Sequence, residues 1–406
     1  MAQQAPVAQR IVSGSRELIG RAYSSQSQDF YRLLAVVLFL VAIGLVMVLS
    51  ASYVDALASK TGSFNIFIRQ AVVGAVGLIL MTFVSVLPMR FFFGISRIAF
   101  FGAAGLQFIT LFVGKEINGN RNWLQIVGDF AIQPSEFLKV GIILLLAYNI
   151  SNTWNELDDG KVWRNNVMFA IGGLGLVIAG RDMGTGIIMF LVIFGVAILA
   201  GLPRPWMLGS AVVAAIGGLF LLSQSSSRWP RITAWMNPDA PDPLNYNWQQ
   251  DHGIWAIAAG GWTGVGLGNS KMKWSWIPEV ENDFIFAVVG EELGLIGCLV
   301  VIALFVYLIF LLFKIAQKTQ DLFGRLVVTG VGIWITAQAV INIAVVLDML
   351  PVLGVPLPLI SAGGSSLLAL LGAVGLVLAV ERDNHAGRPM GTMPKRFSAT
   401  KPVGRR

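Results

Sequence analysis

The segment FIFAVVGEELGLIGCLVVIALFVYLIFLLF, residues 284–313, is an apolar run interrupted near its start by two glutamates. A helix needs about 20 apolar residues to cross a hydrocarbon core roughly 30 Å thick, so this segment is long enough to span a membrane. The rest of the chain has the same character, because 55% of its 406 residues are hydrophobic and only 13% are charged. Together with a mean hydropathy of +0.72, this composition predicts an integral membrane protein.

Apolar segments of similar length lie on both sides of residues 284–313 and predict an all-α polytopic membrane protein with ten transmembrane helices. Two of the predicted loops on the outer side are long, residues 114–135 and, between helices 7 and 8, residues 223–283. Loops of this length are usually functional or disordered, so we expect chemistry on the outer face to lie in them. The predicted spans are residues 33–52, 70–87, 91–113, 136–150, 167–180, 183–201, 206–222, 284–313, 326–347 and 358–380.

The distribution of basic residues predicts the orientation of these spans. With both termini in the cytoplasm, 19 of the 29 lysines and arginines lie inside and 9 outside, while Lys139 lies within a span. Basic residues gather in cytoplasmic loops, so we interpret the net charge of +7 as topology and expect no nucleic acid partner. We divide the chain into a cytoplasmic extension at 1–32, which lacks a signal-peptide pattern, a membrane domain at 33–382 and a basic cytoplasmic tail at 383–406.

Composition also excludes several kinds of site. The chain has one cysteine, Cys298, and two histidines, His252 and His385. These numbers exclude a disulfide scaffold, a zinc site built from His and Cys, and a redox dithiol. The glycines at 264, 266 and 268 match neither a P-loop nor a Rossmann fingerprint, and His252 is more typical of a hydrogen-bonding group than of a catalyst.

Ionisable residues within or beside spans are expensive and are therefore functional candidates. Glu136 and Lys139 are three residues apart at the start of a predicted helix, so both side chains lie on one face. Two interpretations remain open for them, an internal ion pair and a site for an anionic substrate. Arg121, in the preceding loop, is either an exposed charge or a substrate contact.

Four further carboxylates stand at or near the outer ends of predicted helices. Asp182 precedes the sixth span and Asp283 the eighth, where each is either a helix cap or a functional group. Glu291 and Glu292 follow Asp283 by eight and nine residues, about 12 Å deeper at a rise of 1.5 Å per residue. We expect these two glutamates to bond to neighbouring helices.

Several short motifs, taken together and in order, resemble the SEDS family of bacterial proteins, which includes RodA, FtsW and SpoVE. The resemblance runs from about residue 30 to residue 382. The matching motifs are QPSEFLK (133–139), DMGT (182–185), GVGLGNS (264–270), NDFIFA (282–287), GEELG (290–294) and LPLISAGGSS (357–366).

This resemblance implies a ten-helix peptidoglycan glycosyltransferase of the bacterial cytoplasmic membrane that polymerises lipid II at the outer face. It implies that the carboxylate residue Asp283 is the essential catalytic residue and that Glu136 and Lys139 line a central cavity. It also implies that the partner is a class B penicillin-binding protein, a transpeptidase, alongside other cell-division membrane proteins. The chain departs from the family pattern at Arg181, where proline is common, at Ala362, where an aromatic residue is usual, and at His252-Gly253, often Gln-Ser.

Glycosyl transfer from a lipid pyrophosphate requires a base for the acceptor hydroxyl and positive charge for the departing pyrophosphate. Asp283 is the candidate base. Arg121 and Lys139, and more weakly Lys271 and Lys273, are the candidate cations, with Asp182 as a further substrate contact. A divalent cation is an alternative source of positive charge for the pyrophosphate, but the loops contain no Asp-x-Asp pair that would suggest its ligands. No other cofactor is evident from the sequence.

Two other classes of function compete with this one. A lipid II flippase is expected to show paired interrupted helices and coupling ions at the midplane, whereas Asp283 lies outside. A non-catalytic scaffold that recruits the transpeptidase requires no carboxylate at position 283. Within the enzyme class, the polar amino-terminal extension and the basic tail favour a septal, FtsW-type role over an elongation, RodA-type role.

The predicted orientation can be tested with introduced cysteines. Asn120→Cys and Ala240→Cys, in the two outer loops, are expected to react with an impermeant thiol reagent added to intact cells, and Gln320→Cys is not. Labelling of position 320 would overturn the arrangement.

Overall fold

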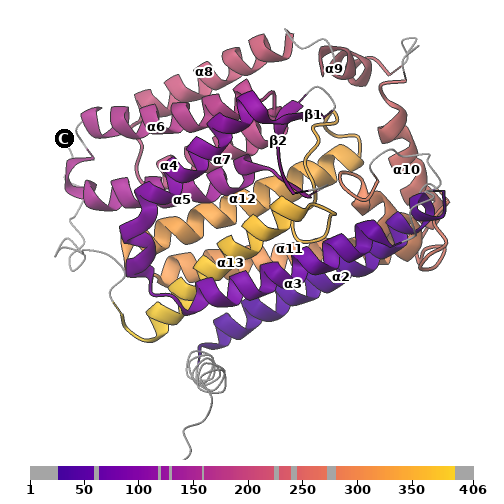
Figure 1. Ribbon diagram of the computed structural model, residues 1–406, viewed down its shortest axis with the longest axis horizontal. Coiled ribbons are helices and arrows are strands. Elements are labelled where there is room, and N and C mark those ends of the chain that lie inside the picture. The colour runs from indigo at the N-terminus through magenta and orange to yellow at the C-terminus, as the bar shows by residue number, and fades with distance from the viewer. Residues whose placement is uncertain are drawn as a thin grey trace, which may run out of the picture.

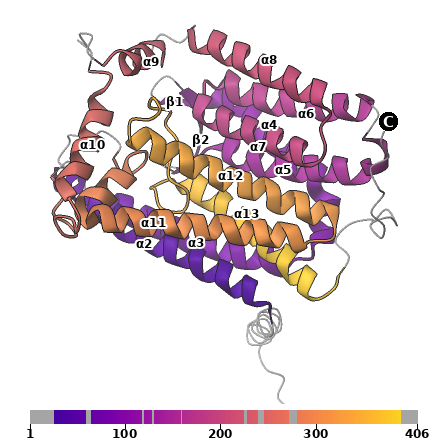
Figure 2. The ribbon, with the colours of Figure 1, turned by 180° about the vertical axis from the view of Figure 1, so that it is seen from behind.

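Long helices lying side by side form the body of the molecule in the computed structural model, which describes residues 26–58, 64–117, 120–127, 130–157, 160–223, 228–238, 245–271 and 280–388 (Figures 1 and 2). The helices are α2 (Gln28–Ala58), α3 (Asn65–Val86), α4 (Met89–Val113), α5 (Pro134–Asn152), α6 (Gly160–Ala179), α7 (Met183–Leu199), α8 (Arg204–Ser223), α9 (Arg228–Met236), α10 (Trp248–Gly260), α11 (Ile285–Lys318), α12 (Leu322–Val346) and α13 (Gly364–His385), with a short 3-10 helix η1 (Trp154–Glu156).

The described helices confirm a polytopic membrane fold. Seven of them, α2 to α5 and α11 to α13, are long and apolar enough to cross a membrane, and α7 is a shorter apolar helix of 17 residues. α5 and α13 are central, with 78% of their apolar windows buried, whereas α3 and α4 are peripheral at 28%. The peripheral helices expose large apolar side chains such as Ile79 and Ile98, as expected of a surface in contact with lipid.

Small residues allow the central helices to approach their neighbours closely. A Cβ atom at Gly375 of α13 would lie 2.8 Å from the carbonyl oxygen of Met81 in α3. A Cβ at Gly77 of α3 would likewise meet the side chain of Leu371. Such contacts replace the hydrophobic driving force that is absent between helices in lipid.

Both loops predicted to be long contain regular structure. Residues 114–135 include an antiparallel sheet of β1 (Lys115–Ile117), β2 (Asn120–Val127) and β3 (Phe130–Ile132), in that order. The all-α prediction missed this sheet, because two of its strands have only three residues and carry almost no periodic signal. The second loop, residues 223–283, includes α9 and α10, and α10 packs beside α11.

The end of the bundle away from the sheet is held by a polar cluster. Asp29 of α2 accepts hydrogen bonds from Lys314 at 2.7 Å and Lys318 at 2.8 Å, both of α11. Lys318 also pairs with the buried Glu381 of α13. Ser27 accepts from the backbone of Phe30 at 3.1 Å. Because of these bonds α2 begins at Gln28, and not at the predicted residue 33.

The two lysines of this cluster differ in a way that can be tested. Lys318→Met leaves Glu381 as a buried carboxylate without its ion-pair partner, which typically costs about 3–5 kcal/mol for a fully buried pair and less here because Lys318 is 36% exposed. Lys314→Met is the matched control, since Asp29 keeps Lys318. We expect Lys318→Met to lower the Tm of the detergent-solubilised protein more than Lys314→Met. Equal Tm values would contradict this account.

Candidate functional site

The amino-terminal ends of several helices meet at the end of the bundle that carries the sheet. The backbone N–H of Gln133, the N-cap of α5, donates to Ser365 Oγ in α13 at 3.0 Å. Its side chain donates to Asp182, the N-cap of α7, at 2.7 Å. The N–H of Ala362, just before α13, donates to the carbonyl of Glu281, just before α11, at 2.9 Å. Four positive ends of helix dipoles therefore converge, which favours an anionic ligand.

Asp182 is the hydrogen-bonding centre of this region. Its Oδ1 caps α7 by accepting from the N–H of Thr185 at 3.1 Å, which confirms the capping interpretation. Its Oδ2 accepts from Asn122 of β2 at 2.8 Å and from Gln133. Asp182 is only 7% exposed, so its carboxylate has little contact with solvent. Its hydrogen bonds instead join the sheet to the amino-terminal ends of α5 and α7.

Arg181, next to Asp182, has φ of 62°, a left-handed conformation that proline cannot adopt. Its carbonyl accepts a hydrogen bond from Arg228 of α9, which also donates to Asn120 at 3.0 Å. Burial lowers the pKa of the Arg228 guanidinium from its usual value, and the nearby Asp182 carboxylate raises it. The departure at position 181 thus coincides with a contact that ties α9 to the site.

Glu136 and Lys139 form an ion pair inside the bundle. Lys139 Nζ lies 2.8 Å from Glu136 Oε1, and the two side chains are 2% and 4% exposed respectively. The ammonium also lies 4.5 Å from the ring centroid of Trp334 in α12, a cation–π contact. Glu136 Oε2 is buried without a hydrogen-bond partner among the described residues. The two charges therefore neutralise each other, while Glu136 Oε2 remains able to accept a hydrogen bond.

A row of polar side chains on α12 links this pair to Asp283. Trp334 Nε1 donates to Gln338 at 2.7 Å, and Gln338 donates to the carbonyl of Pro356 at 2.9 Å. One turn further, Asn342 Nδ2 lies 2.8 Å from the carbonyl oxygens of both Asp283 and Val355. Sequence reasoning missed these three residues, although polar side chains at i, i+4 and i+8 in an apolar span were a usable signal.

Asp283 lies in the turn before α11 and is partly exposed. The N-cap position of α11 belongs to Phe284. A Cβ at Gly354 would lie 3.7 Å from Asp283 Oδ2, so the segment before α13 passes close to the carboxylate. Gly354 has φ of 70°, which favours glycine at this point of close approach. Asn342 therefore holds the backbone of Asp283, while the carboxylate lies beside the segment that precedes α13.

Glu291 and Glu292 hold the glycine-rich segment 261–271 against a break in α11. Glu292 Oε1 accepts from Ser50 of α2 at 2.6 Å, which confirms the expected bond to a neighbouring helix. Glu291 accepts from the side chain of Ser270 and from the N–H of Lys271 at 2.8 Å. The break itself is Gly294, with φ of 68°, where a Cβ would lie 2.4 Å from the backbone of the glycine-rich segment. The glycines of this segment and of α11 therefore allow the two backbones to pack in direct contact.

The remaining predicted site residues are more peripheral. The Arg121 side chain is 48% exposed and lies 3.5 Å from Glu116, while its backbone N–H donates to Gly180 at 3.0 Å. Lys271 is exposed, and Lys273 lies outside the described residues. His252 is buried, with Nδ1 at 2.7 Å from the carbonyl of Trp248, which fits a hydrogen-bonding role.

Among the described residues, no group of three or more His, Cys, Asp or Glu side chains lies together in a way that could hold a metal ion. A divalent cation therefore remains a prediction without assigned ligands.

Comparison with known proteins gives a consistent answer. The sequence model of the family described as cell cycle protein, which covers FtsW, RodA and SpoVE, matches residues 31–386. A probable peptidoglycan glycosyltransferase FtsW of Trichlorobacter lovleyi is 35% identical over 379 residues, covering 90% of this chain and 96% of that protein. Stage V sporulation protein E of Bacillus subtilis is 35% identical over 356 residues, 86% of this chain and 96% of that protein.

Solved structures agree. A chain from a study of the coordination of polymerization and crosslinking by a peptidoglycan synthase complex aligns with a TM-score of 0.72 at 28% identity, covering 89% of this chain and 99% of that chain. The rod shape determining protein RodA of Thermus thermophilus aligns with a TM-score of 0.66 at 27% identity over the same shares. On the family match over residues 31–386 and these relatives, the chain belongs to the FtsW/RodA/SpoVE family.

Proposed function

We propose that this chain is a peptidoglycan glycosyltransferase that polymerises lipid II into glycan strands at the outer face of the bacterial cytoplasmic membrane. The observation that carries the proposal is the position of Asp283, at the end of the bundle where four helix amino termini converge and where Asn342 fixes its backbone. The names of the relatives support the activity, since they are described as peptidoglycan glycosyltransferases.

The reaction joins two lipid-linked sugars. Asp283 accepts the proton of the acceptor hydroxyl, whose oxygen attacks the anomeric carbon of the donor. The new carbon–oxygen bond forms as the bond between that carbon and the pyrophosphate oxygen breaks, so configuration inverts and no enzyme nucleophile is needed. The departing pyrophosphate gains negative charge, which the helix amino termini and nearby cations stabilise.

The roles of the other site residues follow from their positions. Arg121 is an exposed cation on β2 and approaches substrate from the sheet, with Lys271 and Lys273 as weaker candidate cations. Asp182 keeps the sheet in register with the helix ends. Glu136 offers its unpartnered oxygen to a donor on the substrate, and Lys139 holds that carboxylate in place.

The topology and partners belong to the same proposal. In this proposal the chain has ten spans, and the loop of residues 223–283 lies on the outer side between the seventh span (206–222) and the eighth span (284–313). Both termini lie in the cytoplasm. The partner is a class B penicillin-binding protein that crosslinks the strands, together with other cell-division membrane proteins. The similarity to a chain of a peptidoglycan synthase complex supports this partner, and the FtsW relatives support a septal role.

The catalytic role of Asp283 can be tested by Asp283→Asn, which keeps the size of the side chain and removes the base. We expect polymerisation of purified lipid II to fall by a factor on the order of 10²–10⁴, with unchanged binding of the transpeptidase. Asp251→Asn, at an exposed carboxylate of α10, is the matched control and is expected to retain activity.

Two results would count against this assignment. A wild-type polymerisation rate in Asp283→Asn would mean that the carboxylate is not the base, and a flippase would behave in this way because translocation removes no proton from a sugar. A variant that fails to fold would instead favour a purely structural role for Asp283.

The ion pair can be separated from its substrate role by two variants. Lys139→Met alone leaves Glu136 as an uncompensated buried charge, which typically costs about 3–5 kcal/mol. The double variant Glu136→Gln with Lys139→Met removes both charges. We therefore expect the Tm of the detergent-solubilised double variant to return toward the wild-type value, while its polymerisation of lipid II stays low. Recovery of both Tm and activity would show that the pair is only structural.

A further inference from the structure

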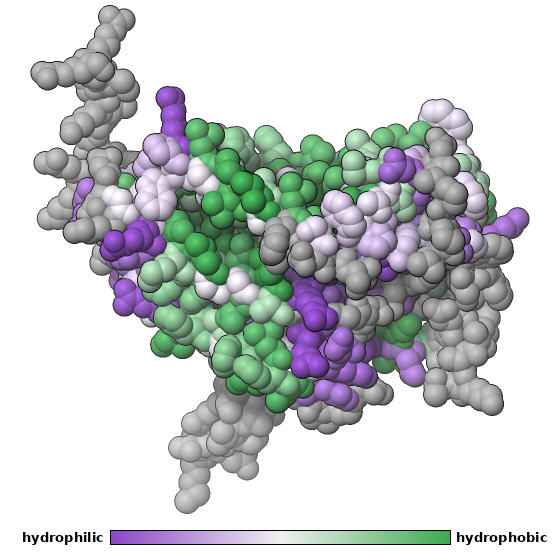
Figure 3. Space-filling model, turned by 90° about the horizontal axis from the view of Figure 1, so that it is seen from above, coloured by the Kyte–Doolittle hydropathy of each residue, from purple (hydrophilic) through white to green (hydrophobic). Residues whose placement is uncertain are grey.

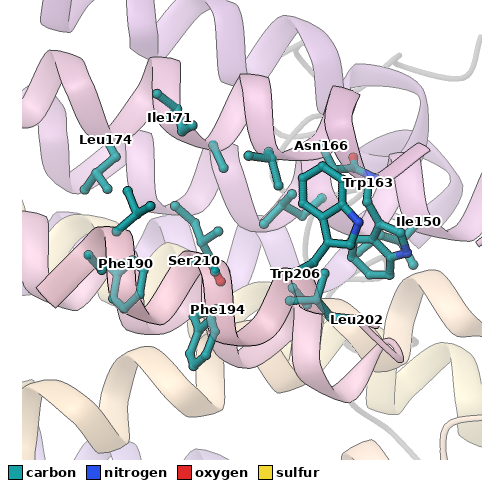
Figure 4. A pocket seen from close by; sticks show the side chains of 18 of the residues that line it. Ile150, Trp163, Asn166, Ile171, Leu174, Phe190, Phe194, Leu202, Trp206 and Ser210 are labelled. Atoms are coloured by element: carbon teal, nitrogen blue, oxygen red, sulfur yellow. The ribbon is translucent and has the colours of Figure 1, made fainter. Parts of the chain in front are cut away.

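α8 stands apart from the helices beside it, and a cavity of about 470 Å³ separates it from α5, α6 and α7. Figure 4 shows apolar side chains of these helices pointing into it, with Trp163 and Trp206 toward one end and Leu174 and Phe190 toward the other. Figure 3 looks onto this edge of the molecule and shows the hydrophobic surface around it. Two lining residues, Ile171 and Val213, are 62% and 70% exposed, so the cavity opens to the lipid-facing side.

The length of the cavity matches one leaflet of a membrane. Along α6 its lining runs from Trp163 to Leu174, a distance of about 16 Å at a rise of about 1.5 Å per residue. This is close to half of a hydrocarbon core roughly 30 Å thick. The cavity lies in the half of the bundle that contains the amino-terminal end of α6. The site around Asp182 lies at the opposite end, because Asp182 follows the carboxyl end of α6.

One end of the cavity is polar. Asn166 lines it, is 4% exposed, and has a buried Oδ1 without a hydrogen-bond partner among the described residues. A buried amide oxygen in this state is costly unless a ligand supplies a donor. Arg164 on α6 and Arg204 at the start of α8 are exposed at the same end of the bundle. The cavity therefore combines a hydrocarbon slot, a neutral hydrogen-bonding group and two nearby cations.

We propose that this cavity binds one acyl chain of an anionic glycerophospholipid whose headgroup carries hydroxyls, the chemistry of phosphatidylglycerol. The chain fills the space between α8 and α6, the headgroup hydroxyl donates to Asn166 Oδ1, and the phosphate lies near Arg164 and Arg204. On the predicted topology this lipid comes from the cytoplasmic leaflet. The long polyprenyl chain of a lipid-linked sugar fits less well, because the slot spans a single leaflet and lies away from Asp283.

The test uses the full-length protein in lipid nanodiscs that contain phosphatidylglycerol with a photoreactive group on one acyl chain. Crosslinked peptides are identified by mass spectrometry, and we expect them in α6, α7 and α8. Phosphatidylcholine and polyprenyl phosphate carrying the same group serve as parallel probes and are expected to label these peptides weakly.

Two substitutions on α8 provide a matched pair. Gly209 lines the cavity and a Cβ there would meet nothing within 4 Å, so the side chain of Gly209→Leu starts from an open position and extends into the slot. Gly217 on the same helix is equally open but is not among the lining residues, so Gly217→Leu is the control. Leucine is a better helix former than glycine, so both variants are expected to fold. We expect loss of labelling in Gly209→Leu and unchanged labelling in Gly217→Leu.

Asn166→Leu tests the headgroup contact separately. It preserves an apolar wall and removes the acceptor, so we expect the preference for the phosphatidylglycerol probe over the phosphatidylcholine probe to disappear. Equal labelling of the wild type and Gly209→Leu, equal labelling by the two phospholipid probes in the wild type, or stronger labelling by polyprenyl phosphate would each overturn the proposal.

Discussion

Charged and polar side chains inside a membrane bundle must find partners within the protein, because hydrocarbon offers no hydrogen bonds. The pair of Glu136 and Lys139 satisfies this constraint at the centre, and its contact with Trp334 leads into the polar row on α12. The same constraint explains why Glu291 and Glu292 bind backbone and hydroxyl groups of the glycine-rich segment. Each buried charge therefore fixes the position of a neighbouring element.

These internal bonds make the end that carries the sheet a fixed frame. Gln133 bonds to Asp182 before α7 and to Ser365 in α13, and Asn342 bonds to the turn at Asp283 and to Val355 in the segment before α13. A frame of helix amino termini supplies positive potential without lysine side chains, whose charge would have to be held in place by other groups. An enzyme that acts on a pyrophosphate benefits from this arrangement, since fixed dipoles need no reorganisation during the reaction.

The sequence predicted the seven described helices that are long and apolar enough to span a membrane, because each is a long apolar run, but it placed α9 and α10 in a loop. It indicated the Glu136–Lys139 pair because the spacing of three residues puts both side chains on one face. It located Asp182 correctly at a helix start but did not reveal its bonds to Asn122 and Gln133, which come from distant segments. The sheet, the early start of α2 and the polar row on α12 depend on contacts between elements. Such contacts leave little local signal.

The loose packing of α8 has a consequence for the site because α9 follows it within five residues, and Arg228 of α9 bonds to Arg181 and Asn120. Arg228 therefore ties the segment that follows α8 to the turn beside Asp182, whereas α5 and α13 are each buried over 78% of their apolar windows. A hydrocarbon chain in the cavity would hold α8 at a set distance and so fix α9. The fold thus combines a hydrogen-bonded frame around Asp182 with a less densely packed edge at α8, the edge at which we propose that an acyl chain binds.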